Sequence, residues 1–187
     1  MTFLSPLSGF LGLAKKTKSK NCVCVVPFGL EKSVSYGSGT KNGPKAILKA
    51  SHQVELFDEE LLQDSYKNFQ INTLKPFKIK KKLTDAVNQL TSITKNILNK
   101  KEFPLILGGE HSITPGIIKA FSQKYKKITI LQIDAHADLR DGYEGEKFSH
   151  ASAIRRCLDY KNIEIISFGI RNLCSDEYKY YKSIPKR

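Results

Sequence analysis

The amino-acid sequence predicts an α/β protein of three layers, in which a mainly parallel sheet lies between two layers of helices. Short apolar runs rich in β-branched residues alternate with segments whose apolar residues recur at helical spacing. This alternation is typical of a parallel sheet covered by helices on both faces. No internal repeat and no linker interrupts the sequence, so we expect residues 1–187 to form a single domain.

The first half of the chain is expected to begin this alternation with a strand over residues 21–28, an apolar run that ends at a proline and a glycine. Pro44 is placed to start a helix, because its fixed φ suits the first helical position. Residues 54–57 are expected to form a second strand. Apolar residues at helical spacing then predict a long amphipathic helix over residues 82–99.

The second half repeats the pattern twice. Its expected elements are a strand over 104–109, a helix capped by Ser112, a strand over 127–133 continued by 134–138, a helix over 149–158 and a strand over 162–169. The last of these is expected to be an exposed edge strand. Because ligands of open α/β sheets bind beyond the carboxyl ends of the strands, the residues that follow strands are the candidates for function.

The composition argues against several classes of protein. The net charge is +13, but the lysines are scattered singly and in short clusters, without the interleaved aromatic residues of a nucleic-acid surface. No apolar run approaches the roughly 18 residues of a membrane span, and the amino terminus lacks the order of features in a secretory signal. The four cysteines include no Cys-x-x-Cys pair. We therefore expect a cytoplasmic protein with neither a nucleic-acid nor a membrane partner.

The sequence Asp-Ala-His-Ala-Asp at 134–138 contains the strongest candidates for a site. On extended backbone Asp134, His136 and Asp138 would point to the same side, because side chains alternate along a strand. Two carboxylates and an imidazole suit Mn²⁺ or Zn²⁺, and carboxylates favour the harder Mn²⁺. A polar strand end with one ion-paired and one capping aspartate is the alternative, but it does not explain the spacing.

Two further histidines lie at expected strand or helix ends. His111 follows two glycines in Gly-Gly-Glu-His-Ser at 108–112. Alone it would be a loop or capping histidine, but beside the cluster on the next strand it is a candidate fourth metal ligand. His150, in Ser-His-Ala-Ser at 149–152, has a side chain suited to proton transfer near neutral pH. Without a metal cluster it would be a surface histidine.

These motifs, followed by Ser-Phe-Gly-Ile-Arg-Asn at 167–172, occur in one order. Together with residues 36–44 and 50–61, they make nearly the whole chain resemble the agmatinase branch of the ureohydrolases, the arginase/agmatinase family. The resemblance implies an arginase-like three-layer fold. It also implies hydrolysis of a guanidinium carbon by a water molecule shared between two Mn²⁺ ions, with release of urea.

By motif match, the resemblance implies that His111, Asp134 and Asp138 bind one manganese and that Asp134 and His136 serve the other. His150 matches the family's catalytic histidine, which handles a proton or the leaving amine. The implied substrate is agmatine, which would yield putrescine and urea. Guanidinobutyrate, formiminoglutamate or another guanidino compound stays open as an alternative, and no substrate-binding residue is assigned.

The sequence departs from the family in one respect. A later motif of the type Ser-x-Asp-x-Asp-x-x-Asp-Pro, which supplies further metal ligands, and a still later glutamate that grips the guanidinium are absent before Arg187. We therefore expect the carboxyl-terminal part of the family domain to be missing and the second metal site to be incomplete. The chain is either an enzyme completed by an oligomer partner or a second polypeptide, as half of a split ureohydrolase, or a non-catalytic remnant. The family commonly forms homo-oligomers.

Overall fold

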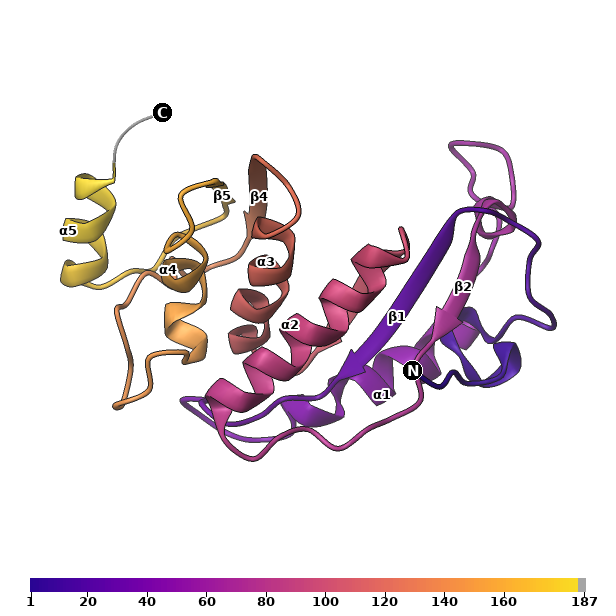
Figure 1. The fold of residues 1–187 in the computed structure, drawn as a ribbon, viewed down its shortest axis with the longest axis horizontal. Helices are drawn as coiled ribbons and strands as arrows, with labels where there is room; N and C mark the ends of the chain where they lie inside the picture. Colours follow the sequence, from indigo (N-terminus) through magenta and orange to yellow (C-terminus); the bar gives the residue numbers. More distant parts are fainter. Residues whose placement is uncertain (185–187) are drawn as a thin grey trace.

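The computed structural model describes residues 1–184, and its strands lie in two separate sheets (Figure 1). In the first sheet, β1 (Cys22–Phe28) lies between β2 (Gln70–Thr73) and β3 (Phe103–Gly108). In the second, β4 (Ile128–Ile133) pairs with β5 (Ile163–Phe168). Each of these strand pairs is parallel, which confirms the expected α/β class.

Among residues 1–184, five α-helices connect or follow the strands. They are α1 (Gly43–Ala50), α2 (Leu83–Asn99), α3 (Thr114–Ser122), α4 (Ala153–Cys157) and α5 (Ser175–Ser183). Short 3₁₀ turns lie at Pro6–Ser8, Phe10–Gly12, Thr40–Asn42, Ser51–Gln53, Ser65–Asn68, His111–Ile113 and His150–Ser152. None of the helices within residues 1–184 combines the length and the hydrophobicity needed to cross a bilayer.

The helices form a continuous layer, whereas the strands below them are interrupted between β3 and β4. α3 packs against both α2 and α4, so these three helices connect the two sheets (Figure 1). Beneath them β3 is hydrogen-bonded only to β1, and β4 only to β5, among the described residues. The sheet is therefore interrupted between β3 and β4, although α3 joins these two strands along the chain.

The main core lies between β1 and α2. Cys24, Val26 and Phe28 of β1 are fully buried and belong to the same apolar cluster as Leu90 and Ile97 of α2. Each such side chain contributes about 1.5–3 kcal/mol when it leaves water. Burial is also the main cause that raises the pKa of the Cys24 thiol to about 12, so this cysteine is a packed apolar group.

Two expectations about local structure are wrong. Residues 54–57 form no strand; the second strand is β2, which the sequence did not reveal because it is short and three of its four residues are polar. Ser112 does not cap α3. It lies inside the 3₁₀ turn that precedes this helix, and its hydroxyl donates a hydrogen bond to the carboxylate of Glu110.

One face of the second sheet is bare. Leu131 and Ile133 of β4 are paired in register with Ile166 and Phe168 of β5, and these four side chains are between 58% and 77% exposed. We call them the bare face. The opposite face is covered, because Ile165 packs against the cluster that includes a buried residue of α4. Parallel sheets are normally covered on both sides, so this apolar surface marks a place where further protein can pack.

The expected exposed edge at the last strand is present, because β5 has β4 as its only hydrogen-bonded neighbour in the described chain. The sequence did not predict the free edges on β3 and on β4. In Figure 1 β4 lies between β5 and the first sheet, so its free edge is on the side of the interruption. Free parallel edges with unpaired backbone groups favour the addition of another strand.

Glu31 holds the segment that leaves β1. Its Oε2 accepts hydrogen bonds from the backbone N–H of Gly39 (2.6 Å) and Lys41 (3.2 Å) and from the Thr40 hydroxyl (3.0 Å). Desolvation raises the pKa of the Glu31 carboxyl, but these hydrogen bonds together outweigh it and lower the pKa to about 2. The charged carboxylate therefore stabilises this loop.

Replacing Glu31 by glutamine is expected to lower the free energy of unfolding at neutral pH, since an amide cannot accept the same set of hydrogen bonds. The folded pKa lies below the ordinary value of 4.5, so the contribution of the carboxylate is complete above that value and is lost as the pH falls toward 2. Urea denaturation should show the difference between wild type and Glu31→Gln shrinking from pH 4.5 down to the lowest pH at which the chain folds. A difference that stays constant over this range would contradict the account.

Replacing Ile133 and Phe168 by lysine is expected to weaken self-association of the chain at least about tenfold, because the two changes remove much of the apolar bare face. Sedimentation velocity over a series of concentrations measures this. The matched control is Phe57→Lys, which changes a side chain of comparable exposure (52%) outside both sheets. Equal association of the double variant and the control would show that the bare face is not responsible.

Candidate metal centre

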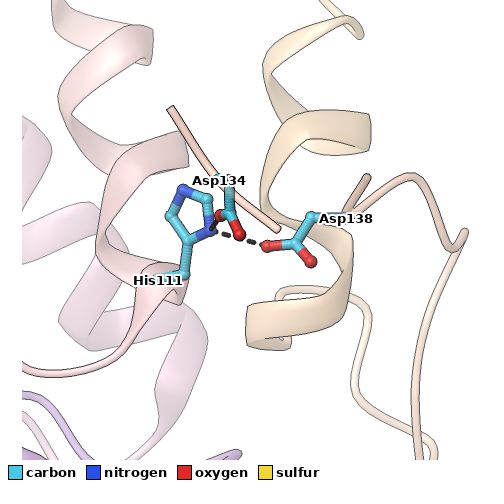
Figure 2. Close-up of side chains that lie close together, drawn as sticks. All are labelled: His111, Asp134 and Asp138. Carbon is cyan, nitrogen blue, oxygen red and sulfur yellow. Dashed lines mark hydrogen bonds and ion pairs between the residues drawn. The ribbon is translucent and has the colours of Figure 1, made fainter. Parts of the chain in front are cut away.

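Three side chains meet beyond the carboxyl ends of β3 and β4. His111 follows β3, whereas Asp134 and Asp138 follow β4 (Figure 2). One ligand atom from each lies within 4.8 Å of the other two. The His111 Nδ1 is 2.6 Å from the Asp138 Oδ2 and 3.5 Å from the Asp134 Oδ2. We call these three residues the metal cluster; it spans the interruption between the two sheets.

The chemistry of this cluster fits a divalent cation. It offers one imidazole nitrogen and carboxylate oxygens from two aspartates, a set that suits Mn²⁺ and Zn²⁺. The side chains are partly open to solvent, with exposures of 29% for His111, 25% for Asp134 and 10% for Asp138. A metal ion could therefore be reached by a small substrate while it is held by protein ligands.

The expectation that residues 134–138 continue the strand is wrong. β4 ends at Ile133, and Asp138 adopts a left-handed backbone conformation with φ 51°. The Asp138 carbonyl accepts hydrogen bonds from the N–H groups of Ile154 (3.1 Å) and Arg155 (3.0 Å), which satisfies donors that the start of α4 leaves unpaired. Aspartate tolerates left-handed backbone better than most residues. Asp138 thus reaches the cluster from irregular backbone and not through strand alternation.

His136 lies beside the metal cluster and not within it. Its side chain is 63% exposed, and its Nδ1 is 3.8 Å from the Asp134 Oδ1. The backbone N–H of His136 donates to the same oxygen at 2.9 Å. The two carboxylate oxygens of Asp134 therefore have different neighbours, because Oδ2 faces His111 and Oδ1 faces His136. The structure brings three of the four predicted ligands together.

His150 lies at the beginning of the 3₁₀ turn before α4. Its Nε2 is 2.9 Å from the Ser35 hydroxyl and its Nδ1 is 3.4 Å from the Ser33 hydroxyl. The Tyr143 ring meets the imidazole edge-on, with the ring centres 5.8 Å apart. Among residues 1–184 no hydrogen bond or ion pair joins His150 directly to the metal cluster.

Two buried glutamates support the site, and the sequence analysis missed both. Glu110 and Glu177 are each 5% exposed. The Glu177 carboxylate accepts hydrogen bonds from the backbone N–H of Leu139 (2.9 Å) and Cys174 (2.7 Å), so it ties the segment after Asp138 to the start of α5. Glu110 could have been noticed as a charge between Gly-Gly and a candidate ligand. Glu177 lies in a stretch of lysines and tyrosines that gives no such signal.

An ion pair involving a buried arginine lies behind the site. Arg156 of α4 is 3% exposed, and its guanidinium is 2.7 Å from the carboxylate of Asp141 and 3.1 Å from that of Asp159. The hydrogen bond from Arg156 is the largest cause that lowers the pKa of the Asp141 carboxyl. This interaction connects α4 to the segment that follows the metal cluster.

The chain is similar in sequence to one known protein family and to individual proteins. The arginase family matches residues 21–185. The N(1)-aminopropylagmatine ureohydrolase of Synechocystis sp. is 35% identical over 161 residues, which cover 83% of this chain and 52% of that protein. The agmatinase of Bacillus cereus is 35% identical over 168 residues, which cover 86% of this chain and 56% of that protein.

The fold agrees with the sequence comparison. The solved structure of the agmatine ureohydrolase of Thermoplasma volcanium superposes with a TM-score of 0.75 at 28% identity, over 87% of this chain and 54% of that chain. This confirms the expected arginase-like three-layer fold. The chain spans about half the length of the curated relatives it matches. With a family match over most of its residues and with relatives of this identity, the chain belongs to the arginase family.

Proposed function

We propose that the chain carries part of the active site of an agmatinase-like amidinohydrolase in the cytoplasm. The observation that carries this proposal is the convergence of His111, Asp134 and Asp138 at the ends of two parallel strands. The proposed reaction adds water to the guanidinium carbon of agmatine. The bond from that carbon to the alkyl-substituted nitrogen breaks, and that nitrogen leaves with a proton as putrescine while the carbon leaves in urea.

The proposed cofactor is Mn²⁺. His111, Asp134 and Asp138 would hold one ion, and His136 would join the other Asp134 oxygen as a ligand of a second ion. Support comes from the two differently placed oxygens of Asp134. When bound, such cations lower the pKa of water at the site and stabilise the negative charge that develops during its attack. The protein's own part is to hold the ligands at the carboxyl ends of β3 and β4.

His150 is the proposed proton-transfer residue. Its imidazole is partly buried and lies between the hydroxyls of Ser33 and Ser35, which orient both ring nitrogens. An imidazole so held can give a proton to the leaving amine and recover one from water.

The proposed substrate is agmatine, and other guanidino compounds are alternatives. A relative at 35% identity is named for N(1)-aminopropylagmatine, and guanidinobutyrate and formiminoglutamate remain possible substrates of the same kind of site. Urea or formamide release from each compound, measured under one set of conditions, distinguishes them.

We further propose that the site is completed by a polypeptide equivalent to the carboxyl-terminal part of an arginase-family chain. The matched region covers only 52% and 56% of these relatives, and the free edges of β3 and β4 and the bare face offer such a polypeptide a surface. A strand placed between β3 and β4 would lie directly beside the metal cluster. Pairing of the same surfaces with a second copy of the chain, as a homo-oligomer, is the competing outcome.

A non-catalytic metal-binding protein is the second candidate function. It is favoured by the fact that only three ligand atoms converge among the described residues, whereas Mn²⁺ is usually bound by more donors.

The metal site is tested by isothermal titration of the chain with MnCl₂. His111→Ala and Asp134→Asn are each expected to weaken binding of the tightest ion at least about 10–100-fold, since even indirect partners of ligands have effects of that size. His136→Ala is the matched control, and it should leave that first ion nearly unchanged. The proposed ligand set would be wrong if His136→Ala weakened the first ion as strongly as His111→Ala did.

The activity is tested by urea release from agmatine with excess Mn²⁺, with the chain alone and with the carboxyl-terminal part of the Bacillus cereus agmatinase fused after residue 184. The chain alone is expected to turn over slowly, because the four proposed ligand residues hold two ions poorly. The fusion should be faster, and His150→Ala should lower its rate about 10²–10⁴-fold. Fast turnover by the chain alone that survives both His150→Ala and His136→Ala would contradict the proposed site.

A further inference from the structure

Glu110 directly precedes His111, a candidate metal ligand, but its side chain faces the segment after β1. Its Oε1 accepts hydrogen bonds from the backbone N–H of Lys32 (3.0 Å) and the Ser112 hydroxyl (2.7 Å). Its Oε2 accepts one from the backbone N–H of Ser33 (2.8 Å). A carboxylate that is 5% exposed would be costly without such donors, so these bonds account for its burial.

Backbone contacts also join the segment after β1 to the segment after β3. The N–H of Glu110 donates to the Leu30 carbonyl at 2.9 Å. At Gly109 a Cβ atom would lie 2.0 Å from that carbonyl oxygen, so only glycine allows this approach. The segment after β1 is therefore fastened to the segment after β3 by both backbone and side chain.

The fastened segment in turn holds His150. The Ser33 Oγ accepts a hydrogen bond from the His150 backbone N–H (3.0 Å) and lies 3.4 Å from its Nδ1. The Ser35 Oγ lies 2.9 Å from the Nε2. A hydroxyl can donate to a bare ring nitrogen or accept from a protonated one. The two serines can therefore keep the imidazole in place through a change of its protonation state.

We propose that Glu110 is a positioning residue that acts through Ser33 to hold the His150 imidazole in a fixed place relative to His111. Glu110 and His111 are consecutive in the sequence, so a single backbone segment carries the candidate metal ligand and anchors the loop that holds His150. The importance of this placement for catalysis rests on the proposed function, but the placement itself can be measured without metal or substrate.

The test uses nuclear magnetic resonance of the chain labelled uniformly with nitrogen-15, so that both the backbone amides and the ring nitrogens of its four histidines are observed. Glu110→Gln keeps the size of the side chain but turns an NH₂ group toward at least one donor. We expect the ring-nitrogen signals of His150 to shift or broaden, and the amides of Lys32 and Ser33 to exchange with solvent about tenfold faster. Ser38→Ala, at an exposed serine of the same loop, is the matched control and should change neither.

Coupling through Ser33 predicts a non-additive result. Ser33→Ala should move the same His150 signals, and the double variant should move them little further than the larger single change. Unchanged His150 signals in Glu110→Gln, despite faster exchange of the loop amides, would overturn the proposal. Should Glu110→Gln fail to fold, Ser112→Ala removes one donor from Glu110 and should shift the His150 signals in the same direction; unchanged signals there and in Ser33→Ala would likewise overturn it.

The outcome is independent of the proposed reaction. In one outcome, the His150 signals depend on Glu110 and Ser33 while the fusion protein releases no urea. That result would contradict the proposed function and leave the role of Glu110 in placing His150 intact. A fusion that releases urea through His150, with His150 signals insensitive to Glu110 and Ser33, contradicts the positioning role alone.

Discussion

The contact between His111 and Asp138, at 2.6 Å, joins two sheets that share no backbone hydrogen bond among the described residues. His111 belongs to the end of β3 and Asp138 to the segment after β4, so the metal cluster exists only if these strand ends are kept at one place. The helix layer α2–α3–α4 does this, since α3 packs on both neighbours above the interruption. The site is thus supported from one side by helices and is open on the side of the free strand edges.

Two buried carboxylates fix the loop segments around this contact. Glu110 fastens the loop after β1 to the start of the segment with His111, and Glu177 fastens the residue after Asp138 to α5. Each accepts hydrogen bonds mainly from backbone N–H groups, which are the donors that a loop has in excess. Leaving such a buried group unpaired costs about 1–3 kcal/mol, so each glutamate favours one loop conformation over its alternatives.

Sequence patterns predicted those parts of the fold that depend on local physics. Continuous apolar runs gave β1, β3, β4 and β5, and helical spacing gave α2, because these patterns follow from which side chains leave water. β2 was missed, since a short and mostly polar strand has no such pattern. The interruption between β3 and β4 was also not predictable, because alternation of strands and helices says which strands exist and not which ones pair.

The candidate site was also predicted only in part from the sequence. Residue types and order pointed to His111, Asp134 and Asp138, but the reasoning from strand alternation was wrong, because the backbone at Asp138 is set by hydrogen bonds to Ile154 and Arg155, which are distant in sequence. The backbone N–H groups that donate to the Glu110 carboxylate lie 77 and 78 residues away in the chain, and no spacing rule reaches that far.

The central claim is that His111, Asp134 and Asp138 form a metal site across the interruption between the two sheets. Anomalous X-ray diffraction from crystals of the chain grown with MnCl₂, recorded at the manganese absorption edge, tests it most directly. The account predicts an anomalous peak about 2–2.5 Å from the ligand atoms of all three residues. A peak at other residues, or none at these three while His111 still contacts Asp138 directly, would contradict it.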